Sequence, residues 1–434
     1  MNKKMPKSGI KNRREFIKSS GAAIILGATA LNMGFPYSMY SLNKDTLKIG
    51  LVGCGGRGTG AAAQALNADP DVVLYAMADV FEDQLNSSLE ILKKAHGKKV
   101  QVDKEHQFVG FDAYQKLIDS GVDVVLLATP PGFRPDHLTA AIDAGKHVFY
   151  EKPVAVDAPG VRKVLAAAKK AKEKNLSIVS GLCFRYDLQK RALYEKVLNG
   201  EIGDIKSISS TRNGGELWYK PRQPNWSDME YQMRNWYYYN WLSGDFIVEM
   251  FVHSLDMMSW AMGDKMPISV TGTGGRIARV DEKYGNIYDH FSAEYEYENG
   301  AKGFIFTRQQ DGCSSRNSLE IAGTQGNAFY EGNRHEITGN NPWQYKGEKN
   351  DMYQSEHDAL FASIRQGNAI NDGEMSANST MLGILSRMVA YSGQTITWEE
   401  AMNSEKILGP ETFSWDLKYQ GPEIAIPGKT KVLL

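Results

Sequence analysis

The sequence predicts an α/β protein in two parts: a doubly wound parallel sheet, then an α+β domain with an open, largely antiparallel sheet. Three observations support this. The chain of 434 residues is longer than one ordinary hydrophobic core requires. Short apolar strands alternate with helical stretches as far as residue 181, and a glycine-rich turn follows the first strand. Beyond residue 181 the strands are longer and partly alternate between apolar and polar residues.

The first sheet is predicted from apolar runs that lie between helical stretches. Continuous apolar strands of this kind are typical of a parallel sheet that helices cover on both faces. The expected strands are 47–52, 72–78, 122–128, 147–150 and 177–180, and the expected helices are 59–66, 135–144 and 158–174.

The second sheet is predicted from strands that hairpin turns connect. Asn299-Gly300 is a strong two-residue turn signal, and Thr324-Gln325-Gly326 indicates another turn. Two late helices, 354–365 and 376–391, can pack against either domain. The expected strands are 207–212, 269–277, 291–297, 302–307 and 318–322.

The composition argues against two kinds of partner. The formal net charge is -1, and the body of the chain holds no large basic block, so we expect no nucleic acid. Cys54, Cys183 and Cys313 are too few and too scattered for a metal cluster or a disulfide framework. We therefore expect no metal.

The N-terminal segment resembles a twin-arginine export signal. Arg13-Arg14 lies in a strongly basic stretch, and an apolar run over 21–33 follows it. Ala28-Thr29-Ala30 offers a small-residue cleavage site. The order of these features favours export, for example to the periplasm, over a disordered cytosolic tail. The apolar run is too short to span a bilayer permanently, so we expect no stable membrane insertion of the mature protein.

The glycine-rich turn is the first chemical signal. The run Gly53-Cys54-Gly55-Gly56-Arg57-Gly58 follows the first strand and opens a helix. Glycines there allow a tight turn, close approach of the backbone to a pyrophosphate, and close packing of helix on strand. The helix N-terminus adds free N–H groups and a positive dipole end. Such a string also occurs in ordinary turns, but its place between strand and helix predicts a Rossmann dinucleotide site.

Asp79 ends the next strand, 21 residues after Gly58, where the dinucleotide fingerprint has an acidic residue. Its carboxylate can accept both ribose hydroxyls of NAD and would repel the 2′-phosphate of NADP. Asp79 can instead cap the helix expected near Glu82, and Arg57 can accept a phosphate. NAD is the cofactor that we expect.

Glu151-Lys152-Pro153 follows another strand of the first sheet. Ligands of a doubly wound sheet bind at the carboxyl ends of its strands, and a lysine there can stabilise negative charge on a substrate oxygen. A solvated ion pair between Glu151 and Lys152 explains the same residues equally well.

These residues and several further motifs resemble the glucose–fructose oxidoreductase/inositol dehydrogenase (Gfo/Idh/MocA) family over nearly the whole chain after the signal segment. The motifs are Gly53 to Gly58, Asp79, Ala128-Thr129-Pro130-Pro131, His137, Ala144-Gly145-Lys146-His147-Val148, Glu151-Lys152-Pro153 and Glu249-Met250-Phe251-Val252-His253. The resemblance implies cofactor contacts from Gly53, Cys54, Gly55, Gly56, Arg57, Gly58, Asp79, Thr129, Pro130, His137, Glu151 and Lys152. The changes of pattern near residues 46 and 181 divide the chain into three predicted segments: residues 1–45, signal and linker; residues 46–181, the NAD-binding Rossmann domain; residues 182–434, the domain for substrate binding and homo-oligomer formation.

His253 is expected on a helix over 251–261, on one face with Asp256. A lone histidine on such a helix is more often packed in the core than catalytic. The resemblance favours an acid/base role, which suits a group that titrates near neutral pH, and a catalytic or substrate-orienting role for Lys152. Four residues before the histidine the family commonly has aspartate, where this sequence has Glu249.

Aromatic residues gather over 234–241, before that helix. Flat rings can cover the apolar faces of sugars, so Trp236 and Tyr238 are candidate substrate contacts. A subunit interface or a loop core explains them equally well. Arg185 and Tyr186, just past the last parallel strand, lie where the family has substrate contacts.

The leading hypothesis is hydride transfer between a secondary hydroxyl of a small sugar or polyol and a tightly held nicotinamide. In it, His253 takes the hydroxyl proton, Lys152 stabilises the oxygen, and Glu249 holds a neighbouring hydroxyl. The second hypothesis is redox-neutral glycoside cleavage by oxidation, elimination and re-reduction, as in glycoside hydrolase family 109, which resembles this scaffold. The segment 249–253 does not match that family. A non-catalytic sugar-binding member is disfavoured because Lys152 and His253 are both present.

Overall fold

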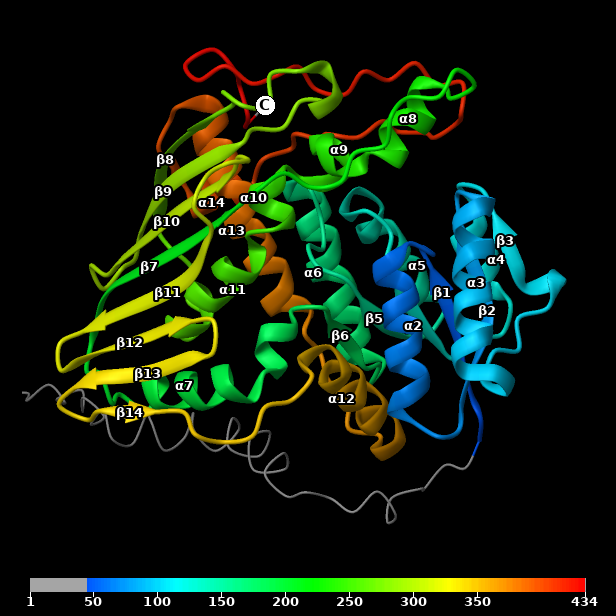
Figure 1. Ribbon diagram of the computed structural model, residues 1–434, viewed down its shortest axis with the longest axis horizontal. Helices are drawn as coiled ribbons and strands as arrows, with labels where there is room; N and C mark the ends of the chain where they lie inside the picture. The colour runs from blue at the N-terminus through cyan, green and yellow to red at the C-terminus, as the bar shows by residue number, and fades with distance from the viewer. Residues whose placement is uncertain (1–44, 434) are drawn as a thin grey trace, which may run out of the picture. The chain divides into compact units, whose positions relative to one another are not determined.

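The computed structural model describes residues 45–433 (Figure 1). The predicted twin-arginine signal and its cleavage site therefore lie outside the described residues. Among the described residues, no helix has the length and apolar character needed to cross a membrane.

The first sheet has six parallel strands in the order β3-β2-β1-β4-β5-β6, as the predicted doubly wound fold requires. The predicted strands all form there. The three-residue strand β3 was not predicted, because it is too short and too little buried to give an apolar run. The strands are β1 (Leu47–Val52), β2 (Val72–Asp79), β3 (Gln107–Val109), β4 (Val124–Leu127), β5 (His147–Tyr150) and β6 (Ile178–Ser180).

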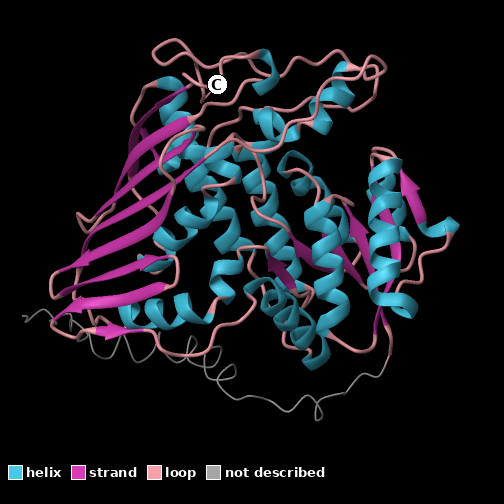
Figure 2. Ribbon diagram, in the orientation of Figure 1, coloured by secondary structure: helices cyan, strands magenta, loops and turns pink. Residues whose placement is uncertain are grey.

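Helices cover both faces of this sheet (Figure 2). They are α2 (Gly56–Ala68), α3 (Glu82–His96), α4 (Ala113–Asp119), α5 (Arg134–Asp143) and α6 (Ala158–Glu173). The late helix α12 (Met352–Gln366) returns to this domain, packs on α2, and buries Leu360 and Phe361 in the core beside β1. The helix α13 (Gly373–Ser392) packs on α6 and also on the second sheet, so it belongs to both domains.

The second sheet has nine strands in the order β14-β13-β12-β11-β7-β10-β9-β8-β15. Its pairs are antiparallel except β7 with β10. Both predicted hairpins form: the turn at Asn299-Gly300 joins β9 to β10, and the turn at 324–326 joins β11 to β12. The strands are β7 (Ile205–Gly214), β8 (Ser269–Gly275), β9 (His290–Glu296), β10 (Lys302–Gln309), β11 (Arg316–Gly323), β12 (Gly326–Glu331), β13 (Arg334–Gly339), β14 (Trp343–Gln344) and β15 (Ile396–Thr397).

One face of the second sheet packs against helices. Along β7 and β10, residues that face the helices alternate with residues that face outward. Ile208, Ser210 and Ile305 face the helices and are buried. The covering helices are α7 (Leu188–Leu198), α11 (Val252–Ala261) and α13. Shorter helices complete the domain: α8 (Asp228–Arg234), α9 (Asn240–Ser243), α10 (Phe246–Glu249) and α14 (Trp398–Met402).

Candidate active site

The glycine-rich turn between β1 and α2 needs glycine at two positions for steric reasons. Gly53 has a φ of +94°, and a Cβ there would lie 2.7 Å from the Ala128 carbonyl carbon. A Cβ at Gly58 would lie 1.9 Å from the carbonyl oxygen of Gly53. Gly55 and Gly56 have open space where a Cβ would point. The turn is therefore packed tightly on the sheet side and leaves room on the other.

The N-terminus of α2 offers backbone donors to a ligand. Its N-cap, Gly55, provides no side-chain hydrogen bond, and the first turn holds no acidic residue. The first N–H groups of the helix, with the positive end of its dipole, are thus available to an anion. This arrangement fits the pyrophosphate of a dinucleotide.

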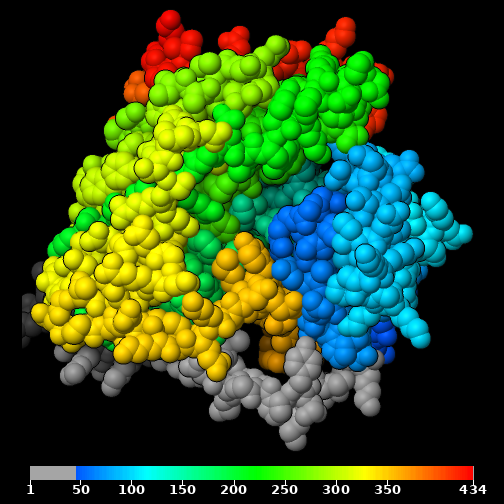
Figure 3. Space-filling view, in the orientation of Figure 1, coloured from blue at the N-terminus to red at the C-terminus, as the bar shows by residue number. Residues whose placement is uncertain are grey.

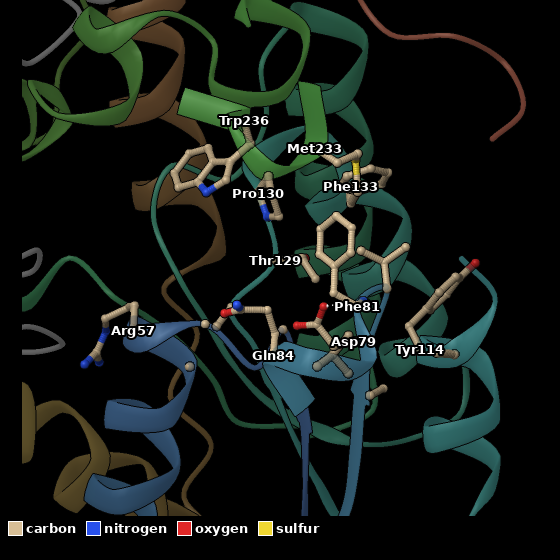
Figure 4. Close-up of a pocket in the computed structure, with 18 of the residues that line it drawn as sticks. Arg57, Asp79, Phe81, Gln84, Tyr114, Thr129, Pro130, Phe133, Met233 and Trp236 are labelled. Carbon is tan, nitrogen blue, oxygen red and sulfur yellow. Dashed lines mark hydrogen bonds between the residues drawn. The ribbon is translucent and has the colours of Figure 1, made fainter. Parts of the chain in front are cut away.

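The turn lines a cavity of about 430 Å³ (Figure 4). Most of the predicted cofactor residues lie in its wall: Gly53, Gly55, Gly56, Arg57, Gly58, Asp79, Thr129, Pro130 and His137. The predicted contact Cys54 is buried behind the turn, where its backbone N–H donates to Asp79 Oδ2 at 2.6 Å.

Asp79 joins the glycine turn to the start of α3. Its Oδ2 accepts from Cys54 and its Oδ1 accepts from the Phe81 N–H at 2.8 Å. Asp79 is not the N-cap of α3, because Phe81 occupies that position. Burial raises the pKa of Asp79, although the backbone donors oppose that shift. The carboxylate faces the cavity (Figure 4), as a ribose ligand would require.

Arg57 does not lie beside Asp79. Its guanidinium donates to Glu151, to Gln64 at 3.0 Å and to Glu356 at 3.5 Å. Figure 4 shows the side chain directed away from Asp79. The structure therefore offers no support for Arg57 as a partner of a 2′-phosphate.

His137 forms a neutral part of the cavity wall. Its Nδ1 lies 3.2 Å from Thr129 Oγ1, and its ring stacks on Tyr114 with centroids 4.0 Å apart. Burial, and then the charge of Arg134, lowers the pKa of His137 to about 3. The ring is therefore uncharged at neutral pH.

Two of the three predicted catalytic residues, Lys152 and Glu249, are in contact past the end of β5, and the third, His253, follows on the next helix. Lys152 Nζ donates to Glu249 Oε1 at 3.0 Å and to the Glu249 backbone oxygen at 2.9 Å. Glu249 ends α10, and His253 lies in the first turn of α11. The longer carboxylate of Glu249 thus reaches the lysine directly.

His253 is poised as a neutral base. It is buried against the Phe184 ring, with centroids 4.7 Å apart, and its Nδ1 has no hydrogen-bond partner among the described residues. Burial, followed by the positive charges of Lys152 and two further cations, holds the pKa of His253 well below its usual range. The ring can therefore accept a proton at neutral pH.

Asp245 fixes the start of α10 and hence Glu249. It has a φ of +74°, which is rare for a residue with a side chain. Its Oδ1 accepts from Phe246 N–H, and its Oδ2 accepts from Tyr288 N–H at 2.9 Å and Tyr391 Oη at 2.6 Å. Burial raises the pKa of Asp245 to about 6.

Of the four predicted substrate contacts, Trp236 lines the cavity. Tyr238 is buried, and its hydroxyl donates to the Leu217 backbone oxygen at 3.0 Å. Tyr186 donates to Asp372 at 3.0 Å. Arg185 binds two carboxylates instead of facing the cavity: Asp256 at 2.8 Å and Asp264 at 2.6 Å. The polar groups of these three residues thus have internal partners.

Two further segments lie beside the cavity. The aromatic run at 234–241 indicated one end of the first, and no sequence motif indicated the second. The first, residues 218–236, contributes Trp218, Lys220, Met233 and Arg234 as well as Trp236 to its wall. Arg234 spans to α3, where it binds Asp83 at 3.0 Å and covers the Phe81 ring at 3.9 Å. The second, residues 413–419, places Trp415 5.5 Å from Phe81. We call these the cover segments.

Comparison with known proteins agrees with this architecture. A model described as "Oxidoreductase family, NAD-binding Rossmann fold" (GFO_IDH_MocA) matches residues 47–178, and "GFO/IDH/MocA C-terminal domain" matches residues 191–329. A myo-inositol 2-dehydrogenase of Thermotoga maritima is 27% identical over 65% of this chain and 75% of its own length. A 2,7-anhydro-N-acetylneuraminate hydratase of Escherichia coli is 26% identical over 45% of this chain and 49% of its own. The solved aldose-aldose oxidoreductase from Caulobacter crescentus, complexed with glycerol, has a TM-score of 0.65 at 18% identity and covers 81% of this chain and 99% of that one.

Proposed function

Since the chain belongs to the GFO/IDH/MocA oxidoreductase family, we propose that this NAD-dependent enzyme oxidises a secondary hydroxyl of a small sugar or polyol. The observation that carries the proposal is the contact of Lys152 with Glu249 one turn before the neutral His253. Glu151 directly precedes Lys152, and its carboxylate binds Arg57, which lies in the cavity wall. The dehydrogenase and aldose-aldose oxidoreductase relatives support a polyol or sugar substrate.

The three residues have different roles. His253 takes the hydroxyl proton as the carbon–oxygen double bond forms, and returns it in the reverse direction. Lys152 Nζ stabilises negative charge on that oxygen. Glu249 orients Lys152 and accepts a hydrogen bond from a neighbouring substrate hydroxyl.

The first domain holds the nucleotide. The turn Gly53–Gly58 and the α2 N-terminus bind the pyrophosphate, Asp79 binds the ribose, and Thr129, Pro130 and His137 form the wall. Bound NAD would supply the acceptor for the hydride that leaves the hydroxyl-bearing carbon.

We also propose that the nucleotide stays bound from one turnover to the next. The twin-arginine motif Arg13-Arg14 supports export of the folded protein with its cofactor loaded, to a compartment where no NAD pool can be assumed. The cover segments support retention, because Arg234 and Trp415 pack on Phe81, which lines the cavity. Reduced nucleotide must then be reoxidised in place by a second keto substrate or by the rearranged sugar.

The test is to purify the mature protein, dialyse it extensively, identify its nucleotide, and then add sugars and glycosides without NAD. Stoichiometric NAD and reduction of that NAD by a sugar or polyol support the proposal. A protein that dialyses empty and works only with added NAD overturns retention but leaves the oxidation intact. Failure of every carbohydrate to reduce bound or added NAD overturns the proposed oxidation.

A redox-neutral cleavage or hydration is the second candidate, and the hydratase relative favours it. Oxidation to a ketone acidifies the adjacent C–H, so the leaving group can be eliminated before the ketone is reduced again. The same experiment separates the two candidates. Free sugar or aglycone that accumulates without net NADH indicates the redox-neutral reaction, whereas accumulation of a ketone with equivalent NADH indicates net oxidation.

A further inference from the structure

Arg212 lies on the helix-facing side of the second sheet, near His253. Along β7 it continues the alternation of Ile208 and Ser210, which are buried on that face. Its neighbour on β11 is Asn317, which is exposed and therefore open to a ligand from solvent. Strand β7 also contacts α11, the helix that carries His253.

A chain of contacts connects this part of the sheet to the candidate base. Phe184 stacks against His253 with centroids 4.7 Å apart, and Lys190 Nζ lies 4.6 Å from the Phe184 ring centroid. Lys190 also lies 5.1 Å from the ring of Tyr330, whose hydroxyl donates to Asn317 at 2.9 Å. Arg212 and Lys190 are the two further cations whose charges lower the pKa of His253. Arg212 thus belongs to the surroundings of the base.

Three cations influence His253, namely Lys152, Arg212 and Lys190. Within the described residues the two lysines have an acidic partner and the arginine has none. Lys152 has Glu249 at 3.0 Å, and Lys190 has Asp187 at 2.8 Å. Arg212 has no acidic partner among the described residues, and its buried Nη1 has no hydrogen-bond partner there. A guanidinium without a counterion is costly when it is partly buried. Arg212 Nε and Nη2 are not among the buried atoms without a partner, so an anionic ligand group can reach these two nitrogens and balance the charge.

We propose that Arg212 binds an anionic group of the substrate, so that the preferred substrate is an acidic carbohydrate. This inference rests on the proposed function and specifies the substrate class of the same site. A uronate carboxylate and a sulfate ester share the required chemistry: planar or clustered oxygens with one negative charge, which a guanidinium can bind through two N–H groups. The molecule is hollowed between the N-terminal domain and the second sheet (Figure 3).

Matched pairs of methyl glycosides test this inference. Each pair has one neutral member and one acidic member, either the uronate or the 6-sulfate, in the gluco and galacto series. The kcat/KM ratio within each pair is measured by reduction of the bound nucleotide, and binding is measured by calorimetry. We expect the acidic member of at least one pair to be preferred by about 10- to 100-fold, because hydrogen bonds to charged groups contribute on that scale.

Variants connect the preference to the residue. Arg212→Gln should abolish the preference for the acidic member. Arg212→Lys should retain part of this preference, because lysine keeps the positive charge but lacks the paired N–H donors of a guanidinium. Arg308→Gln is the matched control, since Arg308 is a cation on the adjacent strand β10 whose side chain alternates to the opposite face. This control should keep the wild-type preference.

Two results would overturn the inference while leaving the proposed function intact: equal or better turnover of every neutral member, or an unchanged ratio in Arg212→Gln. Turnover of the sulfates alone or the uronates alone identifies which anion is recognised. If no glycoside reduces the nucleotide, the proposed oxidation fails on this panel, and calorimetry decides the inference. Binding of an acidic glycoside that depends on Arg212 then supports it, and no such binding overturns it.

Discussion

The two halves of the candidate site are built in different ways. The cofactor half is made mainly by backbone: the glycine turn, the N-terminus of α2 and one carboxylate, Asp79, which already accepts two backbone N–H groups. The substrate half is made by side chains that follow β5 or lie on α10, α11 and β7. Two of its buried nitrogens, His253 Nδ1 and Arg212 Nη1, have no partner among the described residues. The first half therefore depends on backbone geometry, and the second half depends on how side chains are paired.

This difference predicts how substitutions rank. A nucleotide that many backbone groups hold should tolerate the loss of one side chain. A reacting hydroxyl that three side chains hold should not, because each group acts on charge that develops in the transition state. Substitutions in the substrate half should therefore mainly affect turnover, and those in the cofactor half should have smaller effects that mainly concern binding.

The largest effect is expected for His253→Ala. Loss of the base should lower kcat by about 10²- to 10⁴-fold, the usual contribution of a positioned acid/base group. The measurement is the single-turnover rate of nucleotide reduction, with nucleotide content and thermal unfolding as controls. A variant that turns over almost like the wild type removes His253 from the mechanism, and one that fails to fold indicates a packing role.

The wild-type pH profile gives an independent check on His253. A base works when deprotonated, so its contribution is lost as pH falls through its pKa. Because burial and nearby cations lower that pKa below its usual value of about 6.5, activity should not fall with a midpoint near 6.5. A His253-dependent midpoint at or above 6.5 would contradict the neutral, buried base.

Lys152→Ala should produce the next largest effect, a loss in kcat of about 10²- to 10³-fold, because one preorganised donor to a developing oxyanion contributes on that scale. Cofactor content should be unchanged. Lys163→Ala is the matched control, since it removes an exposed lysine paired with Asp136, and exposed pairs contribute about 1 kcal/mol or less. Equal rates for the two variants would show that Lys152 does not stabilise the transition state.

The structure gathers the predicted glycine turn and Asp79 at one cavity, and the sequence indicated this for a physical reason. Gly53 to Gly58 and Asp79 are close in sequence, and the requirement for glycine comes from local backbone geometry: the positive φ of Gly53 and the contact at Gly58. The strands of the first sheet were equally predictable, because each is a short apolar run. Only β3 lacked such a run.

The substrate half was predicted in part. Lys152, Glu249 and His253 were found through the family resemblance, and the structure brings them together. Arg212 was missed because a single arginine on a strand has no local sequence signature. Its surroundings depend on strands β10 and β11, which pair with β7 but lie far from it in the sequence. Arg185 shows the reverse case: its position suggested a ligand contact, but Asp256, 71 residues later, binds its guanidinium.

In the cofactor half, Asp79→Ala should weaken NAD binding and reduce the preference for NAD over NADP by about tenfold, because the ribose contact and the repulsion of a 2′-phosphate are lost together. Folding should survive, since the glycine turn keeps its other packing. Binding isotherms for both nucleotides measure the change. An unaltered preference would mean that Asp79 only links Cys54 to Phe81 through its hydrogen bonds.

The smallest effect is expected from the cover segments. Arg234→Ala removes the contact with Asp83, whose side chain is 58% exposed, and the cover over Phe81. Such ion pairs contribute about 0.2–1 kcal/mol, so nucleotide should dissociate about two- to fivefold faster while single-turnover kcat stays unchanged. The matched control is Arg222→Ala in the same segment, since Arg222 pairs with Asp228 and does not line the cavity. Stopped-flow exchange against a fluorescent NAD analogue measures both variants. Equal dissociation rates would mean that backbone contacts alone retain the nucleotide, and a large drop in kcat for Arg234→Ala would mean that the cover segments also shape the reacting end of the site.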